Sequence, residues 1–169
     1  NQVIGLGHRS LALITAEHDQ NDRARKRVEG LYLAMRENGL NPEDLQIVET
    51  TYSIENGAKG FDSLMAARRR PTAIICGNDV LAAGALTRAS ETGVSVPDEV
   101  SITGFDDIEL ATIVTPTLTT VHVPHKKMGK KAAGLLVALR NGDETNPSVE
   151  LETDIKWRRS LGPAARRAE

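Results

Sequence analysis

The sequence has few aromatic residues, a single cysteine and no long apolar run, and each of these shortages restricts what the protein can be. Aromatic residues make up only 3% of the 169 positions, so the core must be built from Leu, Val, Ile and Ala. The one cysteine, Cys76, cannot form an internal disulfide, which fits a reducing cytoplasm. No stretch is apolar enough to span a bilayer and no secretory signal is present, although the chain begins with Asn1 and its true start is expected upstream.

The charge is nearly balanced, with a formal net charge of -2. A domain that binds nucleic acid by itself is usually strongly basic, so we do not expect this segment to carry DNA affinity alone. The length is that of one domain with its own core.

Apolar runs and helix-period segments alternate along the first two thirds of the chain. Strands are predicted at Leu11–Thr15, Gln46–Thr51, Thr72–Cys76 and Val100–Gly104. Helices are predicted at Asp22–Asn38, around Phe61–Met65, and at Val80–Thr92. Because strands that alternate with helices form parallel sheets, we expect an α/β fold, a parallel sheet flanked by helices.

The alternation ends after Asp107. The sequence then predicts an extended segment at Thr115–Val121, a helix whose apolar positions run from Met128 to Leu139, and short β-like runs at Val149–Leu151 and Ile155–Arg158.

Ligands of open parallel sheets bind outside the carboxyl ends of the strands, so the residues just past each predicted strand are candidates for a binding site. They are Glu17, His18 and Asp19; Tyr52 and Ser53; Gly77, Asn78 and Asp79; and Phe105, Asp106 and Asp107. Carboxylates, an amide and aromatic rings suit a small polyhydroxylated or heterocyclic ligand.

Four cations crowd the first turns of the helix that follows the first strand: Arg23, Arg25, Lys26 and Arg27. The helix dipole disfavours cations there by a few tenths of a kcal/mol each, roughly, so a ligand oxygen or a carboxylate such as Asp106 could compensate at least one of them. The alternative is a solvated surface run, which so small a penalty permits.

The motifs of common enzymes and metal sites are absent. There is no phosphate-binding Gly-rich loop followed by Lys and Ser or Thr, and no GxSxG nucleophile turn. His8, His18, His122 and His125 lack metal-ligand spacing, so we expect no metal and no cofactor. Asp106 and Asp107 leave an acid/base or Mg²⁺ enzyme open as an alternative, but carboxylates at strand ends are more often hydrogen-bond acceptors.

A series of short motifs recurs in a characteristic order over nearly the whole chain. They are Gly7-His8-Arg9, Arg27-Val28-Glu29-Gly30, Pro71-Thr72-Ala73-Ile74, Asn78-Asp79, Ala82-Ala83-Gly84-Ala85, Gly93 to Asp107, Pro116 to Val121, Met128-Gly129 and Arg158-Arg159-Ser160. In this order and spacing the chain resembles the C-terminal portion of LacI/GalR-family transcription regulators.

This resemblance implies a periplasmic binding protein-like fold of type I, with two α/β subdomains and a ligand cleft between them. Residues 9–122 and 148–169 would form the C-terminal effector-binding subdomain, residues 1–8 the end of a first-subdomain helix, and residues 123–147 a crossover helix returning to the first subdomain. The DNA-binding headpiece would lie upstream, outside this chain.

The resemblance also implies roles for individual residues. Arg27 matches an arginine that reaches the effector, Asn78 and Asp106 match groups that bind its hydroxyls or ring nitrogens, and Tyr52 matches a stacking aromatic. Asn21, Arg23 and His18 are further ligand-binding candidates. Val123 stands where many members have Gln, so no ligand role is carried over to it.

The implied function is effector sensing by a homodimeric, cytoplasmic, non-enzymatic repressor. A small molecule (a sugar, a sugar derivative, or a purine- or nucleoside-like compound) would alter operator affinity through the upstream headpiece. The helix Val80–Ala89 and the segment Ile108–Pro116 resemble the family's dimerisation surface, although the chain itself could cover the small residues of that helix. The main alternative is a periplasmic sugar-binding protein of a transport system.

Overall fold

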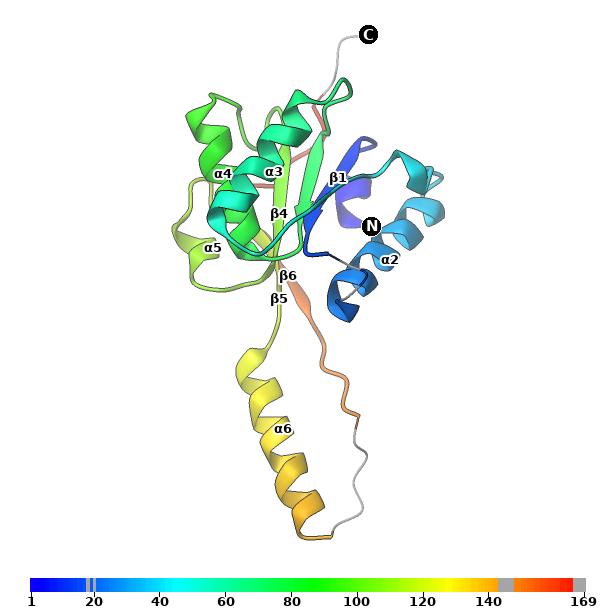
Figure 1. Ribbon diagram of the computed structural model, residues 1–169, viewed down its shortest axis with the longest axis vertical. Helices are drawn as coiled ribbons and strands as arrows, with labels where there is room; N and C mark the ends of the chain where they lie inside the picture. The colour runs from blue at the N-terminus through cyan, green and yellow to red at the C-terminus, as the bar shows by residue number, and fades with distance from the viewer. Residues whose placement is uncertain (18, 20, 143–147, 166–169) are drawn as a thin grey trace.

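In a computed structural model, residues 1–17, 19, 21–142 and 148–165 are described, and they form a sheet body from which one helix projects (Figure 1). The strands are β1 Leu11–Thr15, β2 Gln46–Glu49, β3 Ala73–Cys76, β4 Ser101–Asp106, β5 Thr119–His122 and β6 Asp154–Lys156. The helices are α1 Gln2–Gly5, α2 Asp22–Glu37, α3 Ile54–Ala66, α4 Asp79–Glu91, α5 Leu110–Ile113 and α6 His125–Arg140, with a 3₁₀ turn at Pro42–Asp44.

The six strands form one sheet in the order β2-β1-β3-β4-β5-β6. The first five are parallel, which confirms the predicted α/β class, and β6 pairs antiparallel with β5. The predicted β-like run Val149–Leu151 was wrong as a strand, since these residues have no strand structure. Val149 is 45% exposed there, and no described strand pairs with it.

Alternate side chains of β1 point into two separate cores. Ala12 and Ile14 pack with residues of α3 and α4, while Leu11 and Leu13 pack with α1 and α2. Near-continuous apolar runs such as this one are expected of parallel strands that are covered on both faces. Helices α1 and α2 therefore lie on one face of the sheet and α3 and α4 on the other.

Helices α3 and α4 approach each other closely through glycines. A Cβ added to Gly57 would lie 2.1 Å from the Leu81 carbonyl oxygen, and one added to Gly84 would lie 2.0 Å from the Ile54 carbonyl oxygen. The neighbouring Ala82, Ala83 and Ala85 are buried in the chain's own core. Of the two explanations for the small residues of this helix, cover by the chain itself is the one observed.

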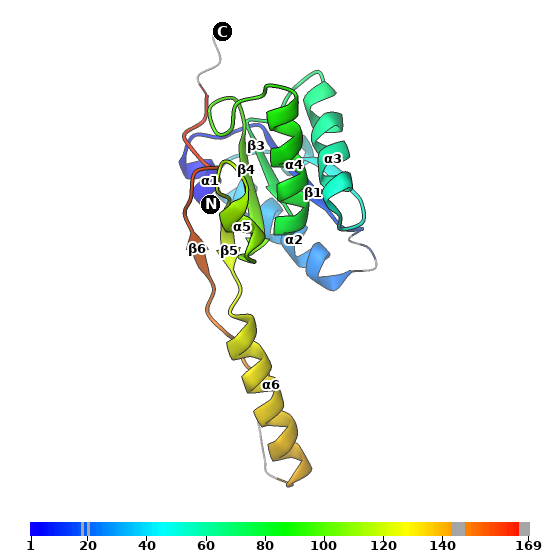
Figure 2. The ribbon, with the colours of Figure 1, turned by 90° about the vertical axis from the view of Figure 1, so that its left-hand side faces the viewer.

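Helix α6 stands away from the sheet body, as two perpendicular views show (Figure 2). None of its described residues is buried, and Leu136, Val137 and Leu139 are each at least half exposed. Its sequence pattern predicted a helix but gave no partner. No helix in the described part of the chain is long and apolar enough to cross a membrane.

Candidate functional site

The sheet order reverses at the boundary between β1 and β3, because the chain moves from β1 to β2 on one side and then to β3 on the other. In doubly wound folds the ligand crevice lies outside the carboxyl ends of the strands at this switch point. The backbones are close here, since a Cβ on Gly77 would lie 3.3 Å from the Cα of Thr15 and 3.4 Å from the Ile14 carbonyl oxygen. The fold therefore places a candidate site at the edge predicted from the sequence.

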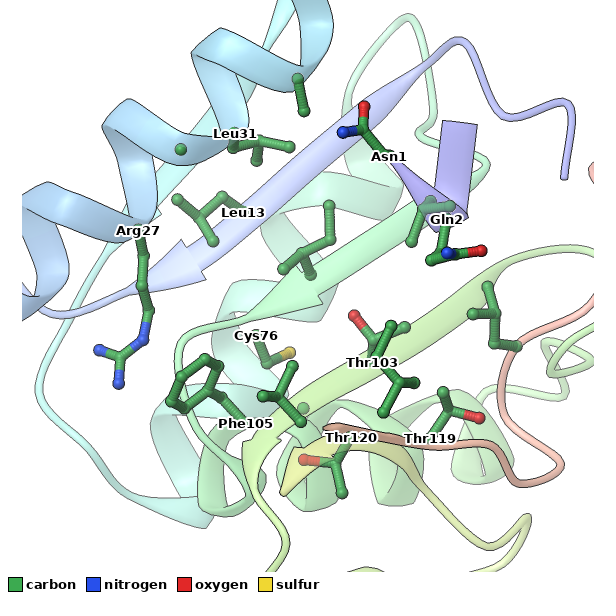
Figure 3. A pocket seen from close by; sticks show the side chains of 18 of the residues that line it. Asn1, Gln2, Leu13, Arg27, Leu31, Cys76, Thr103, Phe105, Thr119 and Thr120 are labelled. Carbon is green, nitrogen blue, oxygen red and sulfur yellow. The ribbon is translucent and has the colours of Figure 1, made fainter. Parts of the chain in front are cut away.

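Arg27 and Phe105 meet at this edge although they come from different elements. The guanidinium carbon of Arg27, on α2, lies 4.2 Å from the centre of the Phe105 ring at the end of β4 (Figure 3). A guanidinium over an aromatic face is attracted by the ring quadrupole, which holds its plane in a fixed orientation. Arg25 of the same run differs, since it pairs with Asp22 and Glu29 on the exposed face of the helix.

Asp106 supplies the acidic group of the site. Burial raises its pKa, against the opposing charges of Arg27, His125 and Arg23. Its backbone has a φ of 114°, and Asp107 follows with a φ of 56°. Non-glycine residues in this region are rare and cluster at functional sites, so the loop holds two carboxylates in a conformation that costs energy.

Two buried polar atoms find no hydrogen-bond partner among the described residues. They are the Thr15 hydroxyl oxygen, at the end of β1, and Nε of Arg27. Buried polar groups are nearly always satisfied by protein, water or ligand, so both atoms make this edge a candidate binding site for a polar molecule.

The other predicted residues occupy different positions. The Asn21 side chain caps α2 by accepting hydrogen bonds from the backbone N–H groups of Arg23 and Ala24, and Asn78 caps α4 through the N–H of Leu81. Tyr52 is 41% exposed between β2 and α3. His18 lies outside the described residues. The capping roles of Asn21 and Asn78 occupy their carbonyl oxygens and fix where their amides lie.

Two carboxylates were missed as organising residues by the sequence reasoning. Asp79 is fully buried; its oxygens accept hydrogen bonds from the Thr120 hydroxyl at 2.5 Å and from the Ile108 N–H at 2.9 Å. Burial raises its pKa. A Cβ on Gly104 would lie 2.2 Å from Asp79, so only glycine fits there. Asp107 contacts both His122 and Arg158. Both are among the strand-end candidates, but their partners are 15 to 51 residues away in sequence, so no local pattern could have identified these contacts.

A groove of about 380 Å³ lies beside this edge, over the sheet face between α2 and β6 (Figure 3). Leu11, Leu13 and Ile75 form part of its apolar floor, α1 closes one end, and Arg27 and Phe105 lie at the other. Asp106, Asn78 and Tyr52 do not line it. The groove and the strand-end edge therefore share Arg27 and Phe105, whereas Asp106 belongs to the edge alone.

Within the described residues, no three His, Cys, Asp or Glu side chains gather in a way that could hold a metal ion. The histidines around Pro124 are paired with carboxylates instead: His122 Nδ1 lies 2.8 Å from Asp107, and His125 Nε2 lies 4.0 Å from Asp106.

A doubly wound sheet with polar groups at its switch point is the arrangement typical of small-molecule-binding α/β domains. The chain belongs to the periplasmic binding protein-like domain family, whose model matches residues 1–161.

Its relatives within that family are transcription regulators. The chain is 35% identical over 160 residues to the HTH-type transcriptional repressor PurR of Salmonella newport. The matched region is 94% of this chain and 47% of the relative. A LacI-family transcriptional regulator from Enterococcus faecium with bound ribose superposes with a TM-score of 0.88 at 26% identity, over 96% of this chain and 60% of the other. The lac repressor dimer bound to operator and the anti-inducer ONPF superposes with a TM-score of 0.87 at 25% identity, over 95% of this chain and 55% of the other.

These matches confirm the resemblance to LacI/GalR-type regulators and favour a regulator over the transport alternative. The chain spans about half the length of the curated relatives it matches.

Proposed function

We propose that this chain is the ligand-sensing part of a LacI-type repressor, in which a small molecule bound at the strand-end edge alters operator affinity through a headpiece elsewhere in the protein. The observation that carries the proposal is the convergence of Arg27, Phe105 and Asp106 at the switch point, beside the unsatisfied Thr15 hydroxyl and Arg27 Nε. An effector must bind two states of the protein unequally to shift operator affinity.

The residues at the edge suggest the chemistry of the effector. The carboxylate of Asp106 would accept hydrogen bonds from hydroxyls or ring N–H groups, and the Arg27 guanidinium would donate to ligand oxygens. The half-exposed ring of Tyr52 offers a flat face. We propose a sugar, a sugar derivative, or a purine- or nucleoside-like compound; the ribose held by the Enterococcus relative is consistent with this class. Asn21, Arg23, Asn78 and His18 complete the proposed ligand set.

The subdomain division follows the same proposal. Residues 9–122 and 148–169 form the effector-binding subdomain, and residues 123–147 return to the first subdomain, which would cover the exposed apolar side chains of α6. Residues 1–8 are the end of a first-subdomain helix whose Ile4 packs on this sheet. We propose a cytoplasmic homodimer whose contacts include the exposed Ile108 and Ile113.

We propose that the protein is not an enzyme. Acid/base catalysis by Asp106 and Asp107 would need both carboxylates free to exchange protons with a substrate, whereas Asp107 is already engaged by Arg158 and His122.

The test is operator binding by the full-length protein, with purines, nucleosides and sugars added in turn. Arg27→Ala and Asp106→Ala should abolish the response to whichever compound acts, without weakening basal operator binding. Arg25→Ala is the matched control, because Arg25 lies on the same helix and pairs with exposed carboxylates. Full control by the compound in either site variant would refute the assignment.

A further inference from the structure

Two strands connect the sheet body to the projecting helix. The chain leaves through β5 toward α6 and returns through β6, and the two strands run side by side (Figure 2). Their antiparallel register pairs Val121 with Ile155 and His122 with Asp154. We call β5 and β6 the crossover strands, because any movement of α6 relative to the sheet body must pass through them.

A single carboxylate joins both crossover strands. One oxygen of Asp107 accepts a hydrogen bond from Nη2 of Arg158 at 2.6 Å, and the other lies 2.8 Å from Nδ1 of His122. His122 is the last residue of β5, and Arg158 follows β6. The Asp107 side chain is only 13% exposed. Its contacts are therefore largely shielded from water, where charge-assisted hydrogen bonds are strong.

Arg158 is itself fixed to the strand it faces. Its Nη1 donates to the Leu118 carbonyl at 2.8 Å, and its backbone N–H donates to the Thr119 hydroxyl at 2.9 Å. Burial disfavours the charged form of Asp107, but the hydrogen bonds from Arg158 and His122 outweigh it and hold the pKa of this carboxyl below its usual range. Asp107 is thus an ionised group placed between two donors.

The loop that carries Asp107 also carries the proposed ligand residue Asp106. This loop is fixed to the sheet body, because the Ile108 N–H donates a hydrogen bond to the buried carboxylate of Asp79. The same carboxylate accepts a hydrogen bond from the Thr120 hydroxyl of β5. Asp106 in turn faces His125, the first residue of α6, at 4.0 Å. Consecutive carboxylates therefore face the ligand edge and the crossover strands.

We infer that Asp107 is a positioning residue that joins the Asp106 loop to both crossover strands and thereby sets the orientation of α6 relative to the sheet body. The importance of this link for effector sensing rests on the proposed function, whereas the link itself can be tested without any ligand.

The experiment measures the distance between spin labels by pulsed electron paramagnetic resonance in the full-length protein. Labels are placed at Lys59→Cys on α3 and Lys131→Cys on α6, two exposed positions on either side of the crossover strands. Cys76 is buried and its thiol pKa is raised by burial, so it should not react with the label. Asp107→Asn and Arg158→Gln should each broaden the distribution at least about twofold, and the double variant should be no broader than either single one.

Arg159→Gln is the matched control, because it makes the same change at the adjacent, exposed arginine and should leave the distribution as in the parent protein. If Asp107→Asn does not fold, Arg158→Lys tests the same link, since lysine keeps the charge but replaces the two guanidinium nitrogens that donate to Leu118 and Asp107 with a single nitrogen. A lower unfolding midpoint with an unchanged distribution would overturn the inference, because the contact would then only stabilise the fold. Equal broadening in Arg159→Gln would overturn it as well.

The proposed function fails on different evidence. Asp107→Asn could broaden the distance distribution while Asp106→Ala still responds normally to the effector. This result would support the inferred role of Asp107 and refute the proposed ligand site.

Discussion

Helices α2 and α6 have the same length and opposite surroundings. Each has 16 residues and ends near an asparagine, but α2 buries Ala24, Val28, Ala34 and Met35 whereas α6 buries none of its described side chains. The difference lies in what each helix faces: α2 packs on the sheet, and α6 leads away from it (Figure 1). An apolar helical pattern predicts that a helix needs a partner, and the topology decides whether that partner belongs to the same body.

The different surroundings of the sheet body and α6 predict different effects of truncating one leucine in the sheet body and one in α6. Leu118 is fully buried and Leu136 is 68% exposed. Leu118→Ala should lower the free energy of unfolding by about 2–5 kcal/mol, because it removes buried methyl groups and leaves a cavity. Leu136→Ala should change the stability of the sheet body by less than about 0.5 kcal/mol. Chemical unfolding measures both, and equal losses would mean that α6 packs on this body.

Gly84 in α4 and Gly134 in α6 differ in how closely their surroundings pack. A Cβ on Gly84 would lie 2.0 Å from a backbone oxygen of α3, whereas nothing lies within 4 Å of one on Gly134 in α6. Gly84→Ala should cost about 1–3 kcal/mol through overpacking. Gly134→Ala should instead stabilise the helix by up to about 1 kcal/mol, since alanine is the better helix former. Unfolding curves of the two variants should shift in opposite directions, and a shift in the same direction contradicts the packing described.

His8 gives the sheet body a pH dependence of known sign. It is buried, with its ring nitrogens 3.0 Å from the Thr72 hydroxyl and from the Gly162 carbonyl, and burial lowers its pKa. His8 therefore binds a proton near pH 6.5 in the unfolded chain but only at lower pH in the folded chain. The contribution of His8 to the free energy of unfolding should be fully present above that pH. It should fall at lower pH by at most about 1.4 kcal/mol per pH unit. His8→Gln should flatten this part of the profile measured by thermal unfolding, and an unchanged profile would exclude His8 as its source.

The smallest change in stability is expected at Asp106, at the end of β4. Asp106 and Asp107 are adjacent, yet burial raises the pKa of the first while Arg158 and His122 lower that of the second. Asp106→Asn should raise stability near neutral pH by at most about 1 kcal/mol, because an ill-solvated charge is removed. Asp107→Asn should lower stability, because it weakens two hydrogen bonds, and this loss should vanish at low pH where Asp107 is protonated. Shifts of the same sign would contradict the different surroundings.

Much of the fold follows from sequence periodicity. The predicted strand Leu11–Thr15 matches β1 in full, and α2 ends one residue before the predicted boundary at Asn38. The antiparallel β6 could not be predicted, because a short run such as Ile155–Arg158 does not specify its partner or direction. The Val149–Leu151 run contains the β-branched Val149, but none of the described strands pairs with it.

The candidate site was partly predictable. Strand ends indicated Asp106 and Asn78, and an unfavourable charge run indicated Arg27. The stacking of Arg27 on Phe105 and the linkage of Asp107 to Arg158 depend on how distant segments pack, which local patterns do not encode. Polar residues inside otherwise apolar elements, such as Asp79 at the start of α4, were the available signal.

We propose that Arg27 and Asp106 bind a small effector at the strand-end edge. The most direct test is a thermal-shift titration of the full-length protein against sugars, sugar phosphates, polyols, nucleosides and purines. One compound should raise the melting temperature in a saturable way, corresponding to about 2.7 kcal/mol at a hundredfold excess over its Kd, in the parent and in Arg25→Ala but not in Arg27→Ala. A compound that stabilises the parent, Arg27→Ala and Asp106→Ala equally would place the binding site elsewhere and contradict this account.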